Sequence, residues 1–86
     1  MVTNDTRYAF LVALNKAQTL HPSIEPIHRK FEEGFLPNQR NGKEWYSLWY
    51  NFKIDKRYST GVINVTKDGD IIPNIKKYTG EKTIWI

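Results

Sequence analysis

Residues 44–54 alternate between two kinds of side chain, as an extended strand does when one of its faces is buried. The first set is wholly apolar and consists of Tyr46, Leu48, Tyr50, Phe52 and Ile54; the second set consists of Trp45, Ser47, Trp49, Asn51 and Lys53. Successive side chains of a strand point to opposite faces of its sheet. The alternation therefore predicts a strand whose tyrosine face packs on a core and whose tryptophan face points outward.

More strands are predicted after this one. They are expected at residues 59–66, around Ile71, Pro73 and Ile75, and at residues 83–86, the last after a turn at residues 79–80. Asp68 and Gly69 tolerate the left-handed backbone of a tight hairpin turn. Pro73 has no N–H to donate to a ladder, so the third strand is expected at a sheet edge or to end there.

The N-terminal part predicts two helices. Asn4 suits an N-cap for a first helix over residues 5–19, and its apolar stripe consists of Phe10, Ala13, Leu14, Ala17 and Leu20. A second helix is predicted over residues 24–33, with Ser23 as its cap, Pro26 in its first turn and Gly34 at its end. Residues 35–43 are rich in turn formers and are predicted to be a linker loop.

These elements predict one domain over residues 1–86, because 86 residues cannot divide a core between two units. Residues 1–34 form the helical part, residues 35–43 the linker and residues 44–86 the sheet. The expected fold class is α+β, with two N-terminal helices packed on one face of a three- to four-stranded antiparallel meander.

The chain has no cysteine, which excludes disulfides and cysteine-based metal sites and suits a reducing compartment. We expect no signal peptide and no membrane span, and hence a cytoplasmic protein. Residues 37–86 hold nine basic and five acidic side chains, whereas residues 1–36 hold four of each. The surplus of positive charge favours acidic proteins or phosphates as partners.

No linear motif predicts catalysis, a metal or a cofactor. His21, Glu25 and His28 have metal-ligand spacing only on one continuous helix, which Pro22 interrupts. Ser47 would point away from both histidines, so a nucleophile activated by a histidine is not expected. Asp68 and Asp70 flank the predicted turn without the other ligands of a calcium loop.

The tryptophan face is the candidate binding surface. The partner-binding residues that we predict are Lys43, Trp45, Trp49, Lys53, Lys56 and Arg57. Aromatic and arginine side chains dominate protein interfaces, which favours a protein partner; rings interleaved with lysines on a sheet also bind single-stranded nucleic acid, which is the alternative. An unrecognised small enzyme is the third. Residues 35–37 or Trp85 could instead cover the two tryptophans as a minor core.

Two stretches, WYSLWYNF at residues 45–52 and GVINVTKDGDI at residues 61–71, resemble the central hairpins of small bacterial immunity proteins, which neutralise secreted toxins. The resemblance implies a bacterial inhibitor or immunity protein with a toxin as its partner. It transfers no individual residue role. Members that block nucleases tend to be acidic, so the basic charge of this chain counts against a nuclease partner.

Overall fold

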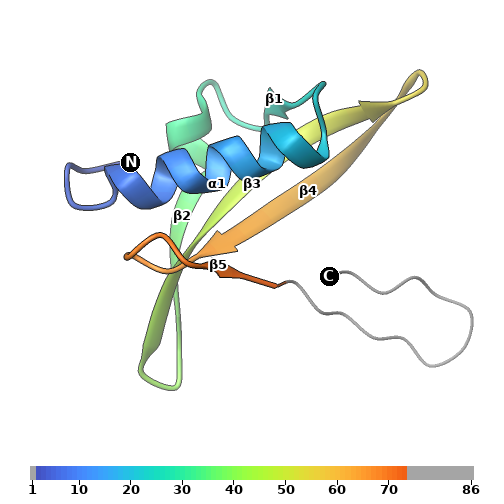
Figure 1. Ribbon diagram of the computed structural model, residues 1–86. Coiled ribbons are helices and arrows are strands. Elements are labelled where there is room, and N and C mark those ends of the chain that lie inside the picture. Colours follow the sequence, from blue (N-terminus) through green and yellow to red (C-terminus); the bar gives the residue numbers. More distant parts are fainter. Residues whose placement is uncertain (1, 74–86) are drawn as a thin grey trace, which may run out of the picture.

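The computed structural model describes residues 2–73, in which one α-helix lies across one face of an antiparallel sheet (Figure 1). The elements in chain order are α1 (Arg7–Leu20), β1 (Glu25–Pro26), the 3-10 turn η1 (Phe31–Gly34), β2 (Phe35–Arg40), β3 (Lys43–Ile54), β4 (Arg57–Val65) and β5 (Ile71–Ile72). The α+β class and the antiparallel sheet are confirmed, and the number of helices is corrected below.

β3 is the centre of the sheet. It pairs with β4 along one side, and along the other side its first half pairs with β2 and its second half with β1. β5 pairs with the end of β4. The turn between them has Gly69 at a φ of 91°, as the Asp68-Gly69 pair predicted, and β5 ends before Pro73. Three predictions fall outside the described residues: the continuation of the third strand to Ile75, the turn at residues 79–80 and the last strand at residues 83–86.

The predicted second helix is wrong. Residues 25–26 are extended and pair with Asn51 and Tyr50 of β3, and only residues 31–34 form a turn of 3-10 helix. Two local causes oppose an α-helix here. Pro26 disfavours the helical conformation of the residue before it, and the Ser23 hydroxyl bonds the Lys53 backbone instead of capping a helix, accepting from its N–H at 3.1 Å and donating to its carbonyl at 3.2 Å.

We expect the loss of this side-chain contact to loosen β1 without unfolding the domain. Ser23→Ala removes two exposed hydrogen bonds, and should lower the free energy of unfolding by about 0.5–1.5 kcal/mol. Amide hydrogen exchange should become faster at Lys53, and urea unfolding measures the stability. Unchanged exchange at Lys53 would contradict the role that we give Ser23 in attaching this segment to β3.

The predicted linker over residues 35–43 is also wrong, because residues 35–40 form β2. Asn41 and Gly42 have φ values of 53° and 80°, the left-handed pair that a two-residue hairpin turn requires. They connect β2 directly to β3, with Arg40 opposite Lys43. Asn41 and Gly42 thus form a tight turn between two strands, whereas the other two predicted turn formers, Pro37 and Asn38, lie within β2.

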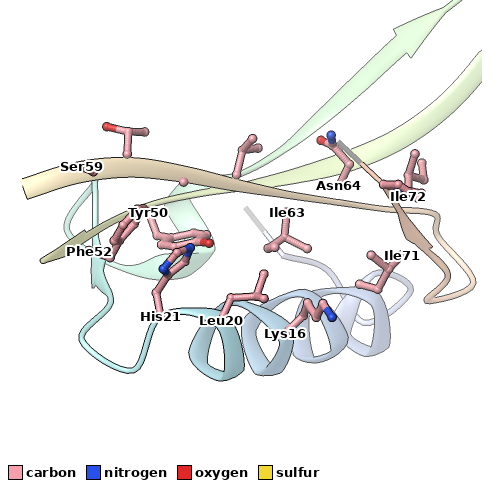
Figure 2. Close-up of a pocket in the computed structure, with 14 residues that line it drawn as sticks. Lys16, Leu20, His21, Tyr50, Phe52, Ser59, Ile63, Asn64, Ile71 and Ile72 are labelled. Carbon is pink, nitrogen blue, oxygen red and sulfur yellow. The ribbon is translucent and has the colours of Figure 1, made fainter. Parts of the chain in front are cut away.

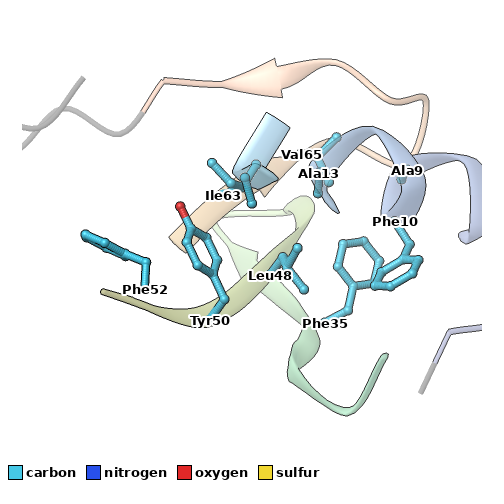
Figure 3. Close-up of a cluster of buried hydrophobic side chains, with 10 residues drawn as sticks. Ala9, Phe10, Ala13, Phe35, Leu48, Tyr50, Phe52, Ile63 and Val65 are labelled. Carbon is cyan, nitrogen blue, oxygen red and sulfur yellow. The ribbon is translucent and has the colours of Figure 1, made fainter. Parts of the chain in front are cut away.

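The core lies between α1 and the face of the sheet that carries Leu48 and Tyr50 (Figure 3). Ala9, Ala13 and Ala17 are fully buried and follow one side of the helix, so their small side chains bring α1 close to β4 and β3. The buried residues are Ala9, Phe10, Ala13, Ala17, Phe35, Leu48, Tyr50, Phe52, Ile63 and Val65. The predicted stripe is confirmed at its centre, whereas Leu20 is exposed. The cap is Thr6 rather than Asn4.

Gly61 lies opposite Tyr50 in the β3–β4 ladder and leaves space for the tyrosine ring. A Cβ atom at Gly61 would lie 2.5 Å from the Tyr50 Cζ atom. Glycine usually weakens a strand because it has no side chain to pack. Here the missing side chain leaves room for the Tyr50 ring to lie under β4. The ring is buried, and its hydroxyl lies beside the His21 ring, between β4 and the end of α1 (Figure 2).

Candidate functional site

The candidate site is the outer face of the sheet, by which we mean the face opposite α1. The register of β2, β3 and β4 places these side chains on it: Leu36, Asn38, Arg40, Lys43, Trp45, Ser47, Trp49, Asn51, Lys53, Tyr58, Thr60, Val62 and Asn64. No helix or strand of residues 2–73 packs over this face (Figure 1). Within that part of the chain the outer face is a broad, open sheet surface.

Trp49 is the largest exposed apolar side chain on β3, with 40% of its surface exposed. It lies opposite Val62 of β4. Leu36, 41% exposed, sits diagonally across from both tryptophans because it pairs with Ser47. Trp45 is half-buried. The middle of the outer face is therefore an apolar cluster of Trp45, Trp49, Leu36 and Val62, which we call the tryptophan cluster.

The predicted orientation of residues 44–54 is confirmed over most of the strand. Leu48, Tyr50 and Phe52 are buried against α1, while Ile54 is 56% exposed because it lies beyond the end of the helix. The alternative in which residues 35–37 fold over the tryptophans is wrong. Phe35 enters the core and Leu36 lies beside the tryptophans as a strand neighbour. Trp85 falls outside the described residues.

A row of polar side chains crosses three strands between the two tryptophans. The Asn38 amide donates to the Ser47 hydroxyl at 2.7 Å, and that hydroxyl donates to the Asn64 side-chain oxygen. Ser47 is only 4% exposed. Both of its hydrogen-bond partners in residues 2–73 are amides rather than bases, so neither could activate Ser47 as a nucleophile. The row instead ties β2, β3 and β4 together beneath the tryptophan cluster.

Positive charge lies at the two ends of the outer face. Arg40 and Lys43 flank the β2–β3 turn at one end. Lys53 lies at the other end, with its ammonium 5.4 Å from the centre of the Tyr58 ring. The Tyr58 hydroxyl donates to Glu25 at 3.4 Å. Trp49 and Lys53 are four residues apart on one strand, which is roughly 13 Å, so the cations surround the tryptophan cluster rather than alternate with it.

The structure gathers four of the six predicted partner-binding residues on one face, namely Lys43, Trp45, Trp49 and Lys53. Lys56 lies in the β3–β4 turn. Arg57 pairs with Ile54 and therefore lies on the opposite side of the sheet from Trp49. These two residues form a separate basic end of the hairpin.

Leu36, Arg40 and Tyr58 are among the outer-face residues that were not predicted. Tyr58 is 55% exposed and pairs with Lys53. The Asn41-Gly42 pair is the signal that could have found the first two, because a two-residue hairpin fixes the register of the strands on either side. Tyr58 was missed because β4 begins at Arg57, two residues before the start of the predicted strand.

The histidines do not form a metal site with their neighbours. In residues 2–73 no three histidine, aspartate or glutamate side chains gather closely enough to hold an ion. His21 instead stacks on Phe52, with the ring centres 3.7 Å apart. No helix in the described part of the chain has the length and apolar character that crossing a bilayer requires.

The chain matches no protein-family model, no curated protein and no solved structure. Its function is therefore inferred from the chemistry of the outer face.

Proposed function

We propose that this chain is a small non-catalytic protein-binding module whose outer face captures another protein. The observation that supports the proposal most is the exposure of Trp49, 40%, beside Leu36, 41%, on a sheet face that no element of residues 2–73 covers. Large exposed aromatic side chains on a rigid surface are the residues that dominate binding energy at protein interfaces.

The arrangement of charge favours a protein over a nucleic acid. Protein interfaces have an apolar centre and a polar, charged rim, which is the order of the tryptophan cluster and of the cations at Arg40, Lys43 and Lys53. A single-stranded nucleic acid needs cations along the row of stacked bases, to meet a phosphate at each nucleotide. Between Trp45 and Trp49 the outer face instead carries the polar side chains of Asn38, Ser47 and Asn64, and no lysine or arginine of the described residues lies among them.

We further propose that the captured protein is one that the chain neutralises, as an inhibitor or immunity protein neutralises a toxin, in the cytoplasm of a bacterium. This part of the proposal is supported by the resemblance of residues 45–52 and 61–71 to immunity proteins and by the absence of cysteine. A rigid sheet face can cover another protein's active surface without any chemistry of its own.

Trp49→Ala tests the proposal. It removes the largest exposed ring of the tryptophan cluster without opening the core, so the fold should persist while affinity for the partner falls roughly tenfold or more, about 1.4 kcal/mol. The measurement is capture from an extract of the native cell at physiological salt after nuclease treatment. Identified partners are then titrated against both proteins.

The matched control is Leu11→Ala, because Leu11 is an apolar side chain of similar exposure, 48%, on the helix side of the molecule. It should retain the partner. Equal capture by Trp49→Ala and Leu11→Ala would remove the outer face from the proposal. Capture that disappears with nuclease, together with an affinity that falls steeply with salt, would assign the surface to nucleic acid.

A further inference from the structure

The first half of β4 has an edge with no strand beside it in residues 2–73. β4 pairs with β3 over its whole length, whereas β5 pairs with only its last two residues. The Thr66 N–H donates to the Asp70 carbonyl on the β5 side. Backbone groups of alternate residues point to the same edge of a strand, so those of Tyr58 and Thr60 point to this edge too. No strand of the described chain pairs with them.

This edge is regular and lacks the features that protect strand edges. Natural sheets protect their edges with prolines and bulges. β2, on the other side of β3, contains Pro37, which has no N–H to offer. β4 contains no proline, and it pairs with β3 one residue for one residue, without a bulge. The first half of β4 can therefore accept a further strand.

A cleft of about 680 Å³ follows the same edge (Figure 2). Residues 59–64 form its wall along β4 and alternate between the two faces of the sheet, because the cleft lies beside the strand. On the inner side, α1 contributes Leu20 and His21, and β3 contributes Phe52. Leu20 is 48% exposed, and His21 stacks on Phe52 with the ring centres 3.7 Å apart. The free edge thus has an apolar floor beneath it.

The charge around the edge favours an acidic occupant. Arg57 begins β4 directly after Lys56 of the turn, and both side chains are exposed. Lys16 lines the cleft toward its β5 end (Figure 2). Among the described residues that line the cleft there is no aspartate or glutamate, and the acid nearest in sequence to Arg57 is Asp55 in the turn. A second copy of the chain would bring its own net charge of +4 to this basic edge, which disfavours self-pairing.

We propose that the free edge of β4 binds an extended acidic segment of a partner protein, which joins the sheet antiparallel to residues 57–61. Its backbone pairs with the N–H and C=O groups of Tyr58 and Thr60. Alternate apolar side chains enter the cleft over Leu20, and an acidic side chain lies opposite Arg57. Strand addition of this kind takes its affinity from main-chain hydrogen bonds and its specificity from pockets for alternate side chains. The proposal does not rest on the tryptophan cluster.

Titration of the full chain with the peptide acetyl-Val-Thr-Val-Thr-Glu-Glu-amide tests the proposal. Its two valines fall on the cleft side of the added strand, and its first glutamate falls opposite Arg57. In the free chain the amides of Tyr58 and Thr60 should exchange rapidly with solvent; with the peptide, their NMR shifts should saturate and their exchange should slow. The same peptide with two lysines in place of the glutamates should bind about fivefold or more weakly.

Thr60→Pro removes the edge N–H without removing a bond to β3, and proline is tolerated on edge strands. It should weaken the acidic peptide roughly tenfold or more, about 1.4 kcal/mol. Thr60→Ala is the matched control, because it changes the side chain and keeps the N–H, and it should stay within about twofold of the natural chain. Urea unfolding verifies that each variant is folded.

Arg57→Glu tests the charge without touching the backbone. It should reverse the preference, so that the lysine peptide binds about fivefold more tightly than the glutamate peptide. Lys30→Glu is its control, since Lys30 is exposed and does not line the cleft, and it should preserve the original preference. Trp49→Ala should bind the acidic peptide normally, so a failure of the outer face and a failure of this edge are distinguishable.

Four results would overturn the proposal. The first is the absence of saturable shifts at Tyr58 and Thr60, including the case in which these amides are already protected by another part of the chain. The second is protection that rises with protein concentration alone, which would assign the edge to a second copy. The third is equal affinity for the two peptides in the natural chain. The fourth is equal binding by Thr60→Pro and Thr60→Ala, which would exclude pairing with the backbone of the edge.

Discussion

Leu48→Ala is expected to destabilise the domain by about 2–5 kcal/mol, because it deletes buried methyl groups and leaves a cavity that the surroundings fill only in part. Leu48 is fully buried at the middle of β3, between the strand and α1 (Figure 3). A domain of this size has roughly 4–13 kcal/mol of stability in total. The loss therefore approaches the whole margin, and a sizeable fraction of the variant should be unfolded on mild warming.

The matched control is Ile54→Ala, on the same face of the same strand but 56% exposed. It should cost less than about 1 kcal/mol, because little of the side chain leaves water on folding. Urea unfolding followed by circular dichroism measures both variants. Similar losses at the two positions would show that the helix does not pack on the tyrosine face as described, and would reopen the assignment of inner and outer faces.

The strand over residues 44–54 was predictable because its pattern is long and strict. Five apolar residues at alternate positions leave one face to bury, and a shift of one residue would bury Trp49 and Lys53 instead. The orientation of the tryptophans follows from that same alternation. The part of the candidate site on β3 could therefore be placed from the sequence.

The second helix was wrongly predicted because the local residues that suggested a helix are equally compatible with an extended segment. Ser23 suits a helix cap, but its hydroxyl bonds the Lys53 backbone, a partner 30 residues away that no local rule reveals. Pro26 suits the first turn of a helix, yet it equally restrains Glu25 to an extended conformation. Short helices receive most of their stability from tertiary packing, and here β3 offers this segment an open edge to pair with.

The outer-face residues of β2 and β4 could not be placed without the register of the sheet. The register in turn depends on which strands pair. Residues 35–40 show no alternation that would mark them as a strand, since Phe35 is buried and the residues after it are largely exposed. Leu36 and Arg40 join the site only because β2 pairs with β3. A single chain gives no direct signal of such pairing, apart from the turn at Asn41-Gly42.

Alkaline pH should destabilise the protein through Tyr50. Burial raises its pKa from an ordinary value near 10 to about 12, so between these values the unfolded chain has lost the phenol proton while the folded chain retains it. The stability that this group contributes is complete below about pH 10 and is lost as the pH rises through about 12. The expected loss is about 1.4 kcal/mol at pH 11 and approaches roughly 2.7 kcal/mol at higher pH.

Tyr50→Phe isolates this effect from the other tyrosines and from the lysines, which titrate in the same range. The variant keeps the buried ring and removes the ionisable hydroxyl, so its stability should fall less between about pH 9 and pH 11, by the same 1.4 kcal/mol or so. Urea unfolding at each pH measures the difference. Parallel curves for the two proteins would mean that the Tyr50 hydroxyl is as well solvated in the folded chain as in the unfolded one. The burial of Tyr50 beneath Gly61 of β4 would then be wrong.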